Sequence, residues 1–398
     1  MSRDLPLDLP RRRRLVAGRF ALALAAATFV VGSLEAPAAL IGFDWRRVFL
    51  SQDQAFLGRM KPWTNPWSVP DAELLYRRPP HSHVAGKARG DCAPWLGIAH
   101  AREYSYDVLY DGRGYRNRRE LAAATVAVVG DSFVEAALVP DDELMTSRLE
   151  RALGVPVVNL GVGGYGPQQE LAVVKRDALP LGPKLLLWCL FEGNDLLDVR
   201  RVERSLREGQ GAKPDFATRS FTANAARFVA RLFEKPLTED SVEARRSSGV
   251  LRIDGADRGT KIYFPYPAEP LSDEDAASLD VVEGLLAEAA RACADRKCEL
   301  VVVFVPEKFR IYRELCDWPT DGHGRTWQPS DLPERLAAWA RERAVSFVDL
   351  TPALRRAADG GELVYFADDG HWNGRGHAVV AAELEKAVRP RLPPEPGR

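Results

Sequence analysis

Five short apolar runs alternate with amphipathic segments in most of the chain after residue 120. The runs are rich in Val, Leu and Phe, and they predict buried strands at residues 125–129, 155–160, 184–191, 300–305 and 345–350. Apolar residues at helical spacing predict helices at residues 133–153 (interrupted at Pro140), 168–178, 276–294, 332–344 and 376–388. Strands that alternate with helices predict an α/β domain with a parallel sheet covered on both faces.

The first forty residues place a basic run before an apolar one. Arginines 11–14 precede residues 15–34, which are apolar except for Arg19 and long enough to cross a ~30 Å hydrocarbon core as a helix. We expect residues 1–43 to be a signal anchor, or alternatively a signal peptide cleaved near Ala36-Pro37-Ala38. A twin-arginine signal and a buried cytosolic helix are the weaker interpretations. The positive-inside rule leaves the arginines inside and exports the rest of the chain.

Composition divides the remainder of the sequence. Residues 44–122 are irregular and rich in Trp, Pro and Arg, which indicates an accessory segment around the core. The α/β domain is expected at residues 123–388, with an insertion at 199–275 after the third strand. Residues 389–398 form a Pro-rich tail that cannot continue a helix.

Charge and cysteine content exclude several classes of protein. The 398 residues include 55 basic and 56 acidic ones, for a net charge of −1, and 46% are hydrophobic. Wholesale disorder is therefore excluded, and nothing indicates a nucleic-acid partner. Five cysteines without a CxxC pair argue against a disulfide scaffold or a zinc ribbon. An oxidising compartment could pair Cys293 with Cys298.

Candidate chemistry follows the predicted strands, where ligands bind in a parallel sheet. Ser132 comes directly after the first strand, at a turn that can expose a nucleophilic hydroxyl, although Ser132 and Glu135 also match a capping box. A glycine-rich turn at residues 159–166 follows the second strand and can aim a backbone N–H at a ligand, but it matches no nucleotide-binding motif. Asn194 follows the third strand and offers a neutral amide donor for an oxyanion.

A fourth motif, Asp368-Asp369-Gly370-His371, precedes the last helix. A carboxylate near a histidine is the combination that a general base and its orienting partner require. An exposed loop histidine is the simpler interpretation of this motif alone. A zinc site built from both aspartates, His371 and His377 is a further alternative, but we expect no metal, because the Gly-rich turn between the histidines does not fix their geometry.

Together, Ser, Gly, Asn and Asp…His resemble the four blocks of the SGNH (GDSL-like) hydrolase superfamily: GDS, a glycine-rich turn, GND and DxxH. The resemblance covers residues 123–388 and implies a three-layer, flavodoxin-like parallel sheet. Residues 111–117 (DGRGYRN) also look like a stretch that precedes GDS in exported members resembling polysaccharide O-acetyltransferases. The roles that the resemblance implies are Ser132 as nucleophile, His371 as base, Asp368 (or the adjacent Asp369) as its orienting carboxylate, and Ser132 N–H, Gly164 N–H and the Asn194 amide as the oxyanion hole.

The resemblance implies a serine-dependent ester hydrolase or acyl (acetyl) transferase that acts on an O-acylated carbohydrate outside the cytoplasm. A lipase or thioesterase, and a non-catalytic glycan-binding or assembly protein, are the alternatives. Lys308 and Arg310 could bind an anionic sugar and Trp372 could stack on a sugar ring, although a basic loop and local packing explain them as well. The expected partners are the ester substrate and the membrane, with no cofactor.

Overall fold

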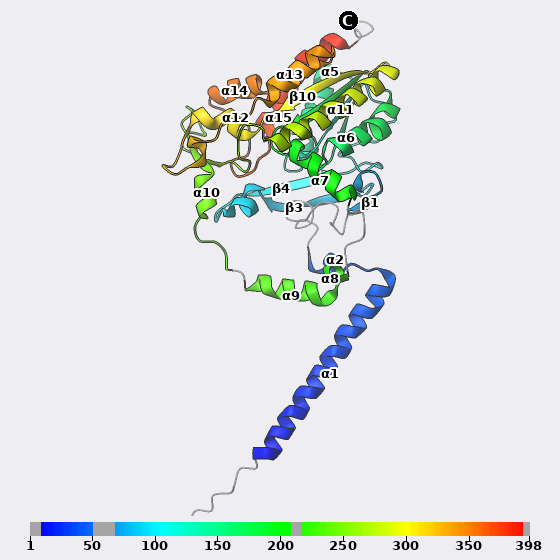
Figure 1. Cartoon of the computed structure of the whole chain (residues 1–398), viewed down its shortest axis with the longest axis vertical. Helices are drawn as coiled ribbons and strands as arrows, with labels where there is room; N and C mark the ends of the chain where they lie inside the picture. The colour runs from blue at the N-terminus through cyan, green and yellow to red at the C-terminus, as the bar shows by residue number, and fades with distance from the viewer. Residues whose placement is uncertain (1–8, 51–67, 208–215, 234, 393–398) are drawn as a thin grey trace, which may run out of the picture. The chain divides into compact units, whose positions relative to one another are not determined.

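The computed structural model describes residues 9–50, 68–207, 216–233 and 235–392. The chain forms two compact units, and the smaller one combines residues 1–51 with residues 213–235 of the predicted insertion. The larger unit contains the remaining residues and all the strands (Figure 1).

The centre of the larger unit is a five-stranded parallel sheet in the order β12-β10-β7-β5-β6. Its strands are β5 (Val126–Gly130), β6 (Val157–Gly161), β7 (Leu185–Phe191), β10 (Glu299–Val305) and β12 (Ser346–Asp349). Numbered along the chain, this order is 2-1-3-4-5, and it reverses direction between β5 and β7. The predicted α/β fold with a parallel sheet is confirmed.

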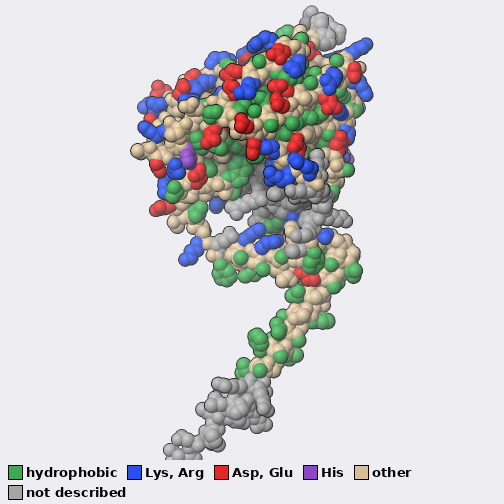
Figure 2. Space-filling view, in the orientation of Figure 1, with side chains coloured by type: hydrophobic (Ala, Val, Ile, Leu, Met, Phe, Trp, Pro, Cys, Tyr) green, Lys and Arg blue, Asp and Glu red, His purple; other side chains and the backbone are tan. Residues whose placement is uncertain are grey.

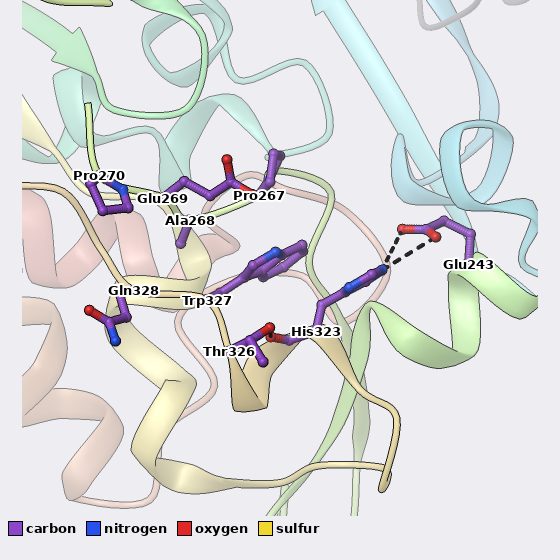
Figure 3. Close-up of a pocket in the computed structure, with 9 residues that line it drawn as sticks. All are labelled: Glu243, Pro267, Ala268, Glu269, Pro270, His323, Thr326, Trp327 and Gln328. Atoms are coloured by element: carbon purple, nitrogen blue, oxygen red, sulfur yellow. Dashed lines mark hydrogen bonds and ion pairs between the residues drawn. The ribbon is translucent and has the colours of Figure 1, made fainter. Parts of the chain in front are cut away.

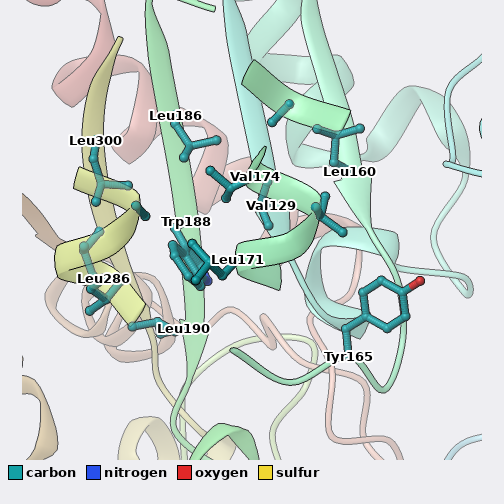
Figure 4. Packing of buried hydrophobic residues seen from close by; sticks show 14 of the residues in the cluster. Val129, Leu160, Tyr165, Leu171, Val174, Leu186, Trp188, Leu190, Leu286 and Leu300 are labelled. Carbon is teal, nitrogen blue, oxygen red and sulfur yellow. The ribbon is translucent and has the colours of Figure 1, made fainter. Parts of the chain in front are cut away.

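Helices bury both faces of this sheet because the apolar side chains of each strand alternate between them. Ala127 and Val129 of β5 face a cluster that includes side chains of α6 (Pro167–Val173), α11 (Asp273–Asp295) and α13 (Leu332–Glu342), part of which is drawn in Figure 4. Val126 and Val128 face the opposite cluster. Its helices are α5 (Met145–Leu153), α14 (Thr351–Asp359) and α15 (Gly374–Val388).

Two of the predicted helices are shorter than their patterns indicate. The segment predicted at 133–153 contains the single turn α4 (Ser132–Glu135), the left-handed Ala136, a 3₁₀ turn at Asp141–Glu143 and only then α5. The segment at 168–178 divides into α6 and a π-helical turn at Val174–Ala178. The sequence analysis also missed α14, which directly follows β12.

The accessory segment forms two antiparallel pairs, where we expected irregular structure. They are β1 (Val69–Asp71) with β2 (Leu75–Arg77), and β3 (His83–Arg89) with β4 (Glu103–Leu109), which are joined through the π-helical turn Ala93–Gly97. The predicted insertion begins within α7 (Asp195–Arg207) and contributes α10 (Val242–Arg246), β8 (Ser248–Leu251) and β9 (Lys261–Tyr263) to the larger unit. β8 pairs with both β9 and β11 (Cys316–Asp317), and α12 (Lys308–Tyr312) follows β10.

The smaller unit contains α1 (Leu9–Ile41), α2 (Arg46–Phe49), α8 (Phe216–Arg219) and α9 (Phe221–Leu232). Within α1, Val16–Ile41 is long and apolar enough to span a membrane, and its side chains are largely exposed (Figure 2). The expected arginine run 11–14 lies at the start of this helix, but its side chains are outside the described part of the structure.

Replacing Gly161 with Ala should destabilise the protein, because the new Cβ would lie 2.5 Å from the Glu135 backbone nitrogen and from Val134 Cβ. Overpacking against backbone in a filled core should lower the free energy of unfolding by about 2 kcal/mol or more. Gly284→Ala is the matched control, since its Cβ meets no atom within 4 Å and alanine favours helix α11 by up to about 1 kcal/mol. Chemical denaturation measures both changes. An unchanged denaturation midpoint for Gly161→Ala would contradict the close packing of Gly161 against the helical turn α4.

Candidate active site

Ser132 is the first residue of the single helical turn that follows β5. The turn is capped by Asp131, whose Oδ1 accepts the Phe133 N–H at 2.9 Å. The capping-box interpretation of Ser132 is therefore wrong, because a different side chain caps the turn and Glu135 points to other partners. The Ser132 hydroxyl lies 2.7 Å from His371 Nε2, a partner 239 residues further along the chain.

His371 lies between the serine and a carboxylate. Its Nδ1 is 2.6 Å from Asp369 Oδ1, and the same oxygen accepts the His371 backbone N–H at 2.9 Å. A carboxylate only accepts when ionised, so in the neutral imidazole Nδ1 carries the proton and Nε2 presents its lone pair to Ser132. The structure thus brings the predicted Ser132 and His371 together in the tautomer that can remove a hydroxyl proton.

The orienting carboxylate belongs to Asp369, which corrects the expectation for Asp368. The Asp368 carboxylate accepts the Arg102 N–H at 2.6 Å and a short hydrogen bond from the Tyr104 hydroxyl. It is therefore engaged by the accessory hairpin rather than by His371. Consecutive side chains of a loop point in different directions, and motif spacing alone did not decide which of the two faces the imidazole.

A second carboxylate beside His371 was missed by the sequence analysis. Asp91 Oδ1 accepts the Gly370 N–H, and the Asp91 N–H donates to Asp369 Oδ2, each at 2.8 Å. Asp91 Oδ2 is buried without a hydrogen-bond partner and lies 3.6 Å from His371 Nδ1. The sequence carries no signal for this role, since Asp91 belongs to the accessory segment and is about 280 positions from the loop.

These carboxylates determine how easily His371 is protonated. Burial opposes the charged imidazolium, but Asp369, with help from Asp91, outweighs it and raises the pKa of His371 to about 9. Burial also opposes ionisation of Asp369, yet the positive charge and hydrogen bonds of His371 hold its pKa below the usual range. Burial and the like charge of Asp369 raise the pKa of Asp91 to about 7.

The predicted oxyanion donors lie at the ends of β6 and β7, at the same edge of the sheet as Ser132. A Cβ at Gly163 would be 3.4 Å from Ser132 Cβ, so the glycine-rich turn touches the serine. The Gly163 N–H already donates to Glu135 Oε2 at 2.6 Å. Gly164, the residue expected to supply the donor, adopts a φ of +84°, which favours glycine.

The side chain of Asn194 lies between two buried carboxyl groups. Its Nδ2 is 3.2 Å from Asp198 Oδ2, and a hydrogen bond from Asn194 also reaches Asp131. Burial raises the pKa of Asp131, and this hydrogen bond opposes the rise. Asn194 is therefore held next to Asp131, the residue that precedes Ser132.

Two of the three expected substrate-binding side chains are buried, and the third is paired with a carboxylate. Lys308 is buried and donates to the carbonyls of Ala367 and Asp369 at 2.8 and 3.1 Å, so it supports the histidine loop. Arg310 pairs with Glu192 and is only 12% exposed. Trp372 is fully buried and packs edge-on against aromatic rings of the core. The expectations for Lys308 and Trp372 are wrong, because both side chains are buried, whereas the binding role expected for Arg310 stays a prediction.

The zinc site considered from the sequence is not assembled. His377 is buried and its Nδ1 accepts the Met145 N–H at 3.1 Å, which explains this histidine as part of the core. Among the described residues, Asp91, Asp369 and His371 do place one donor atom each within 4.8 Å of the others. A cation there would have to replace the Nδ1 proton that joins His371 to Asp369.

A surface cavity of about 730 Å³ lies beside the segment that follows Tyr266 (Figure 3). Tyr266, which precedes this segment, contacts the histidine loop, because a Cβ at Gly370 would lie 3.3 Å from its ring. One wall is formed by the rings of His323 and Trp327, which stack with centroids 5.1 Å apart, and Glu243 lies 3.2 Å from His323 Nε2. The cavity therefore offers aromatic and carboxylate groups at its surface.

Comparison with protein families gives one match. Residues 266–397 match the family model of the SGNH hydrolase-like domain, acetyltransferase AlgX. The match includes the loop that carries Asp369 and His371 but begins after Ser132 and Asn194. No curated protein sequence matches the chain.

Several solved structures are similar in fold. A lipase/acylhydrolase from Enterococcus faecalis is 13% identical over 68% of this chain and 98% of its own, with a TM-score of 0.37. A catalytic mutant of an acetylxylan esterase from Geobacillus stearothermophilus is 14% identical over 67% and 94%, with a TM-score of 0.36. At these scores the likeness is loose, and the fold assignment rests on the strand order and the family match.

The parallel sheet has the flavodoxin-like strand order. At its carboxyl edge Ser132 contacts His371, and His371 contacts Asp369, which is the arrangement of a serine-hydrolase-like α/β protein. The family match over residues 266–397 and the four motif blocks support the resemblance of this arrangement to the SGNH hydrolase superfamily.

Asp369→Asn should slow the reaction of Ser132 with a fluorophosphonate by about 10³–10⁴-fold, because an amide partner stabilises the wrong imidazole tautomer. Asp368→Asn is the matched neighbouring control and should slow labelling by less than tenfold. Labelling rates of both variants, together with circular dichroism to confirm folding, test this difference. Equal losses in the two variants, or a larger loss in Asp368→Asn, would show that Asp369 does not orient His371.

The labelling rate should also rise with pH through about pH 9, because only the neutral imidazole can remove the hydroxyl proton and the pKa of His371 is raised to about 9. Asp91→Asn removes a negative charge beside the ring, so the midpoint should move to lower pH. Asp254→Asn removes a carboxylate that is 94% exposed, and it should leave the midpoint of the pH profile unchanged. Identical midpoints in all three proteins would contradict the electrostatic role of Asp91.

Proposed function

We propose that this protein is a serine-dependent ester hydrolase or acyl (acetyl) transferase that acts on O-acylated carbohydrate outside the cytoplasm. The observation that carries the proposal is the pair of short contacts from Ser132 Oγ to His371 Nε2 and from His371 Nδ1 to Asp369 Oδ1. This geometry provides a nucleophile, a base and an orienting carboxylate. The family match supports an ester-acting enzyme independently of these distances.

In the proposed reaction, Ser132 Oγ attacks the carbonyl carbon of the ester while His371 Nε2 takes the hydroxyl proton. Asp369 stabilises the imidazolium without accepting its proton. The Asn194 amide and the backbone N–H groups of Ser132 and Gly164 would stabilise the negative oxygen of the tetrahedral intermediate. His371 then protonates the departing alcohol oxygen, which leaves the acyl group on Ser132.

The second half of the reaction distinguishes a hydrolase from a transferase. Water or a sugar hydroxyl loses its proton to His371 and attacks the acyl-serine carbonyl, and Ser132 leaves with the proton returned. Two features support a carbohydrate as donor or acceptor. The family model is that of an acetyltransferase, and the cavity near Tyr266 combines stacked aromatic rings with carboxylate and amide groups that can contact sugar rings and hydroxyls (Figure 3).

The proposed location follows from helix α1. Its apolar part Val16–Ile41 is the one segment among the described residues with the length and composition of a membrane span, and arginines precede it in the sequence. The positive-inside rule then leaves the α/β domain outside the cytoplasm, anchored by an uncleaved helix.

Fluorophosphonate labelling of the full-length, detergent-solubilised protein tests the proposed nucleophile. The wild-type protein should be labelled at Ser132, and Ser132→Ala should lose the label while remaining folded, since Asp131 rather than Ser132 caps the helical turn. Incubation of the labelled and unlabelled protein with p-nitrophenyl acetate and a xylo- or manno-oligosaccharide then separates hydrolysis, seen as free acetate, from transfer, seen as an acetylated sugar by mass spectrometry. Persistent labelling of folded Ser132→Ala would refute the proposal.

A further inference from the structure

The end of α1 presents a covered face, although most of this helix is exposed. Val31, Leu34 and Glu35 are partly covered and Ala38 is 6% exposed, at the spacing of one helical face. Helix α9 of the insertion belongs to the same compact unit as α1 (Figure 1). The two helices thus form one unit although Glu35 of α1 and Phe221 of α9 are 186 residues apart in the sequence.

Glu35 joins the two helices directly. Its carboxylate accepts the backbone N–H groups of Phe221 and Thr222 at 3.1 and 2.8 Å, as well as the Thr222 hydroxyl at 2.8 Å. These N–H groups are at the start of α9, where no carbonyl within the helix can accept them. A carboxylate from α1 therefore accepts the first two N–H groups of α9, next to the Ser220 side chain that caps the third.

An aromatic cluster continues this contact beyond the end of α1. Trp45 packs edge-on against Phe221 with ring centroids 5.0 Å apart, and Phe49 of α2 lies 5.5 Å from Phe221 and 5.9 Å from Phe228. The Trp45 N–H also donates to the Arg219 carbonyl at 3.0 Å. Aromatic residues, tryptophan above all, concentrate where a membrane-spanning helix leaves the hydrocarbon.

The remaining apolar face of α9 is exposed. Val229, Leu232 and the following Phe233 are 50%, 67% and 80% exposed, and apolar side chains along α9 are visible in Figure 2. Arg227 and Arg231 lie one helical turn apart on the other side of the helix. A short helix with a continuous apolar face and arginines opposite it has the pattern of a helix that lies in the membrane interface.

We propose that α9 is such an interfacial helix, with Val229, Leu232 and Phe233 inserted into the outer leaflet of the membrane and its arginines toward the phospholipid phosphates. Residues 15–34 of α1 already cover a ~30 Å hydrocarbon core, so Glu35 falls at its outer boundary, and α9 starts at that level. The occupant of the exposed face is therefore the bilayer that α1 spans. This inference rests on the proposed membrane insertion of α1 and is independent of the ester chemistry.

The same contact bears on the processing of the N-terminus. Cleavage after Ala36-Pro37-Ala38 would remove Val31, Leu34 and Glu35 together, so the first two N–H groups of α9 would lose the Glu35 acceptor and α9 would lose its packing against α1. The retained anchor, rather than the cleaved signal peptide, is the state in which these groups are satisfied.

A fluorophore attached at Leu232→Cys in the full-length protein tests the position of α9. The protein is reconstituted in vesicles of phosphatidylethanolamine and phosphatidylglycerol, with Ala230→Cys on the opposite side of the helix as the matched control. The five native cysteines are buried, and the unmodified protein measures their background labelling. The label at position 232 should be quenched by brominated acyl chains and roughly threefold less by aqueous iodide than the label at position 230.

Equal iodide quenching at the two positions would place α9 in water and overturn the proposal. Protection from iodide without quenching by brominated chains would show that protein, such as a second copy of the chain, covers the face instead, and would also overturn it. Sedimentation of the vesicles after a carbonate wash and mass spectrometry of the N-terminus report separately whether α1 is inserted and intact. Fluorophosphonate labelling of Ser132 should be the same in both variants, so failure of the ester-hydrolase proposal is recognised independently.

Discussion

The buried carboxylate of Glu135 is the constraint on which the rest of the site depends. It accepts hydrogen bonds from the Arg78 guanidinium at 2.8 and 2.9 Å, from the Tyr110 hydroxyl at 2.7 Å and from the Gly163 N–H at 2.6 Å. Burial would raise the pKa of Glu135, but Arg78 outweighs it and lowers the pKa. A buried charge that lost such partners would cost several kcal/mol, so the nucleophile turn, the glycine-rich turn and the accessory segment are held together.

The accessory segment therefore does more than cover the α/β domain. Arg116 donates to backbone carbonyls at the end of α4, including that of Glu135 at 3.0 Å, and Asn117 exchanges hydrogen bonds with the Asn159 backbone at 2.9 Å. On the other side of Ser132, Asp91 and Tyr104 hold the loop that carries the histidine. Each reacting residue is thus positioned by side chains that precede the domain in the sequence.

Negative charge around the imidazole gives the site a single electrostatic character. Asp369, Asp91 and Asp131 all favour the protonated form of His371, the form that arises when Ser132 gives up its proton. Asp198, behind Asn194, is itself hard to ionise: burial raises its pKa to about 7, and Asp131 adds to the rise although Arg201 opposes it. The surroundings stabilise the imidazolium while keeping the total buried charge low.

The sequence by itself determined the five strands, their parallel arrangement and the sheet edge at which Ser132 meets His371, because apolar periodicity and strand ends are local properties. It also located the apolar span of α1. Only the tertiary structure decided that Asp369 rather than Asp368 contacts His371, and that Lys308 and Trp372 are buried. It also added Asp91 to the site and brought α9 into contact with α1. Each of these depends on where a side chain points or on contacts between residues far apart in the chain, and neither is encoded in local spacing.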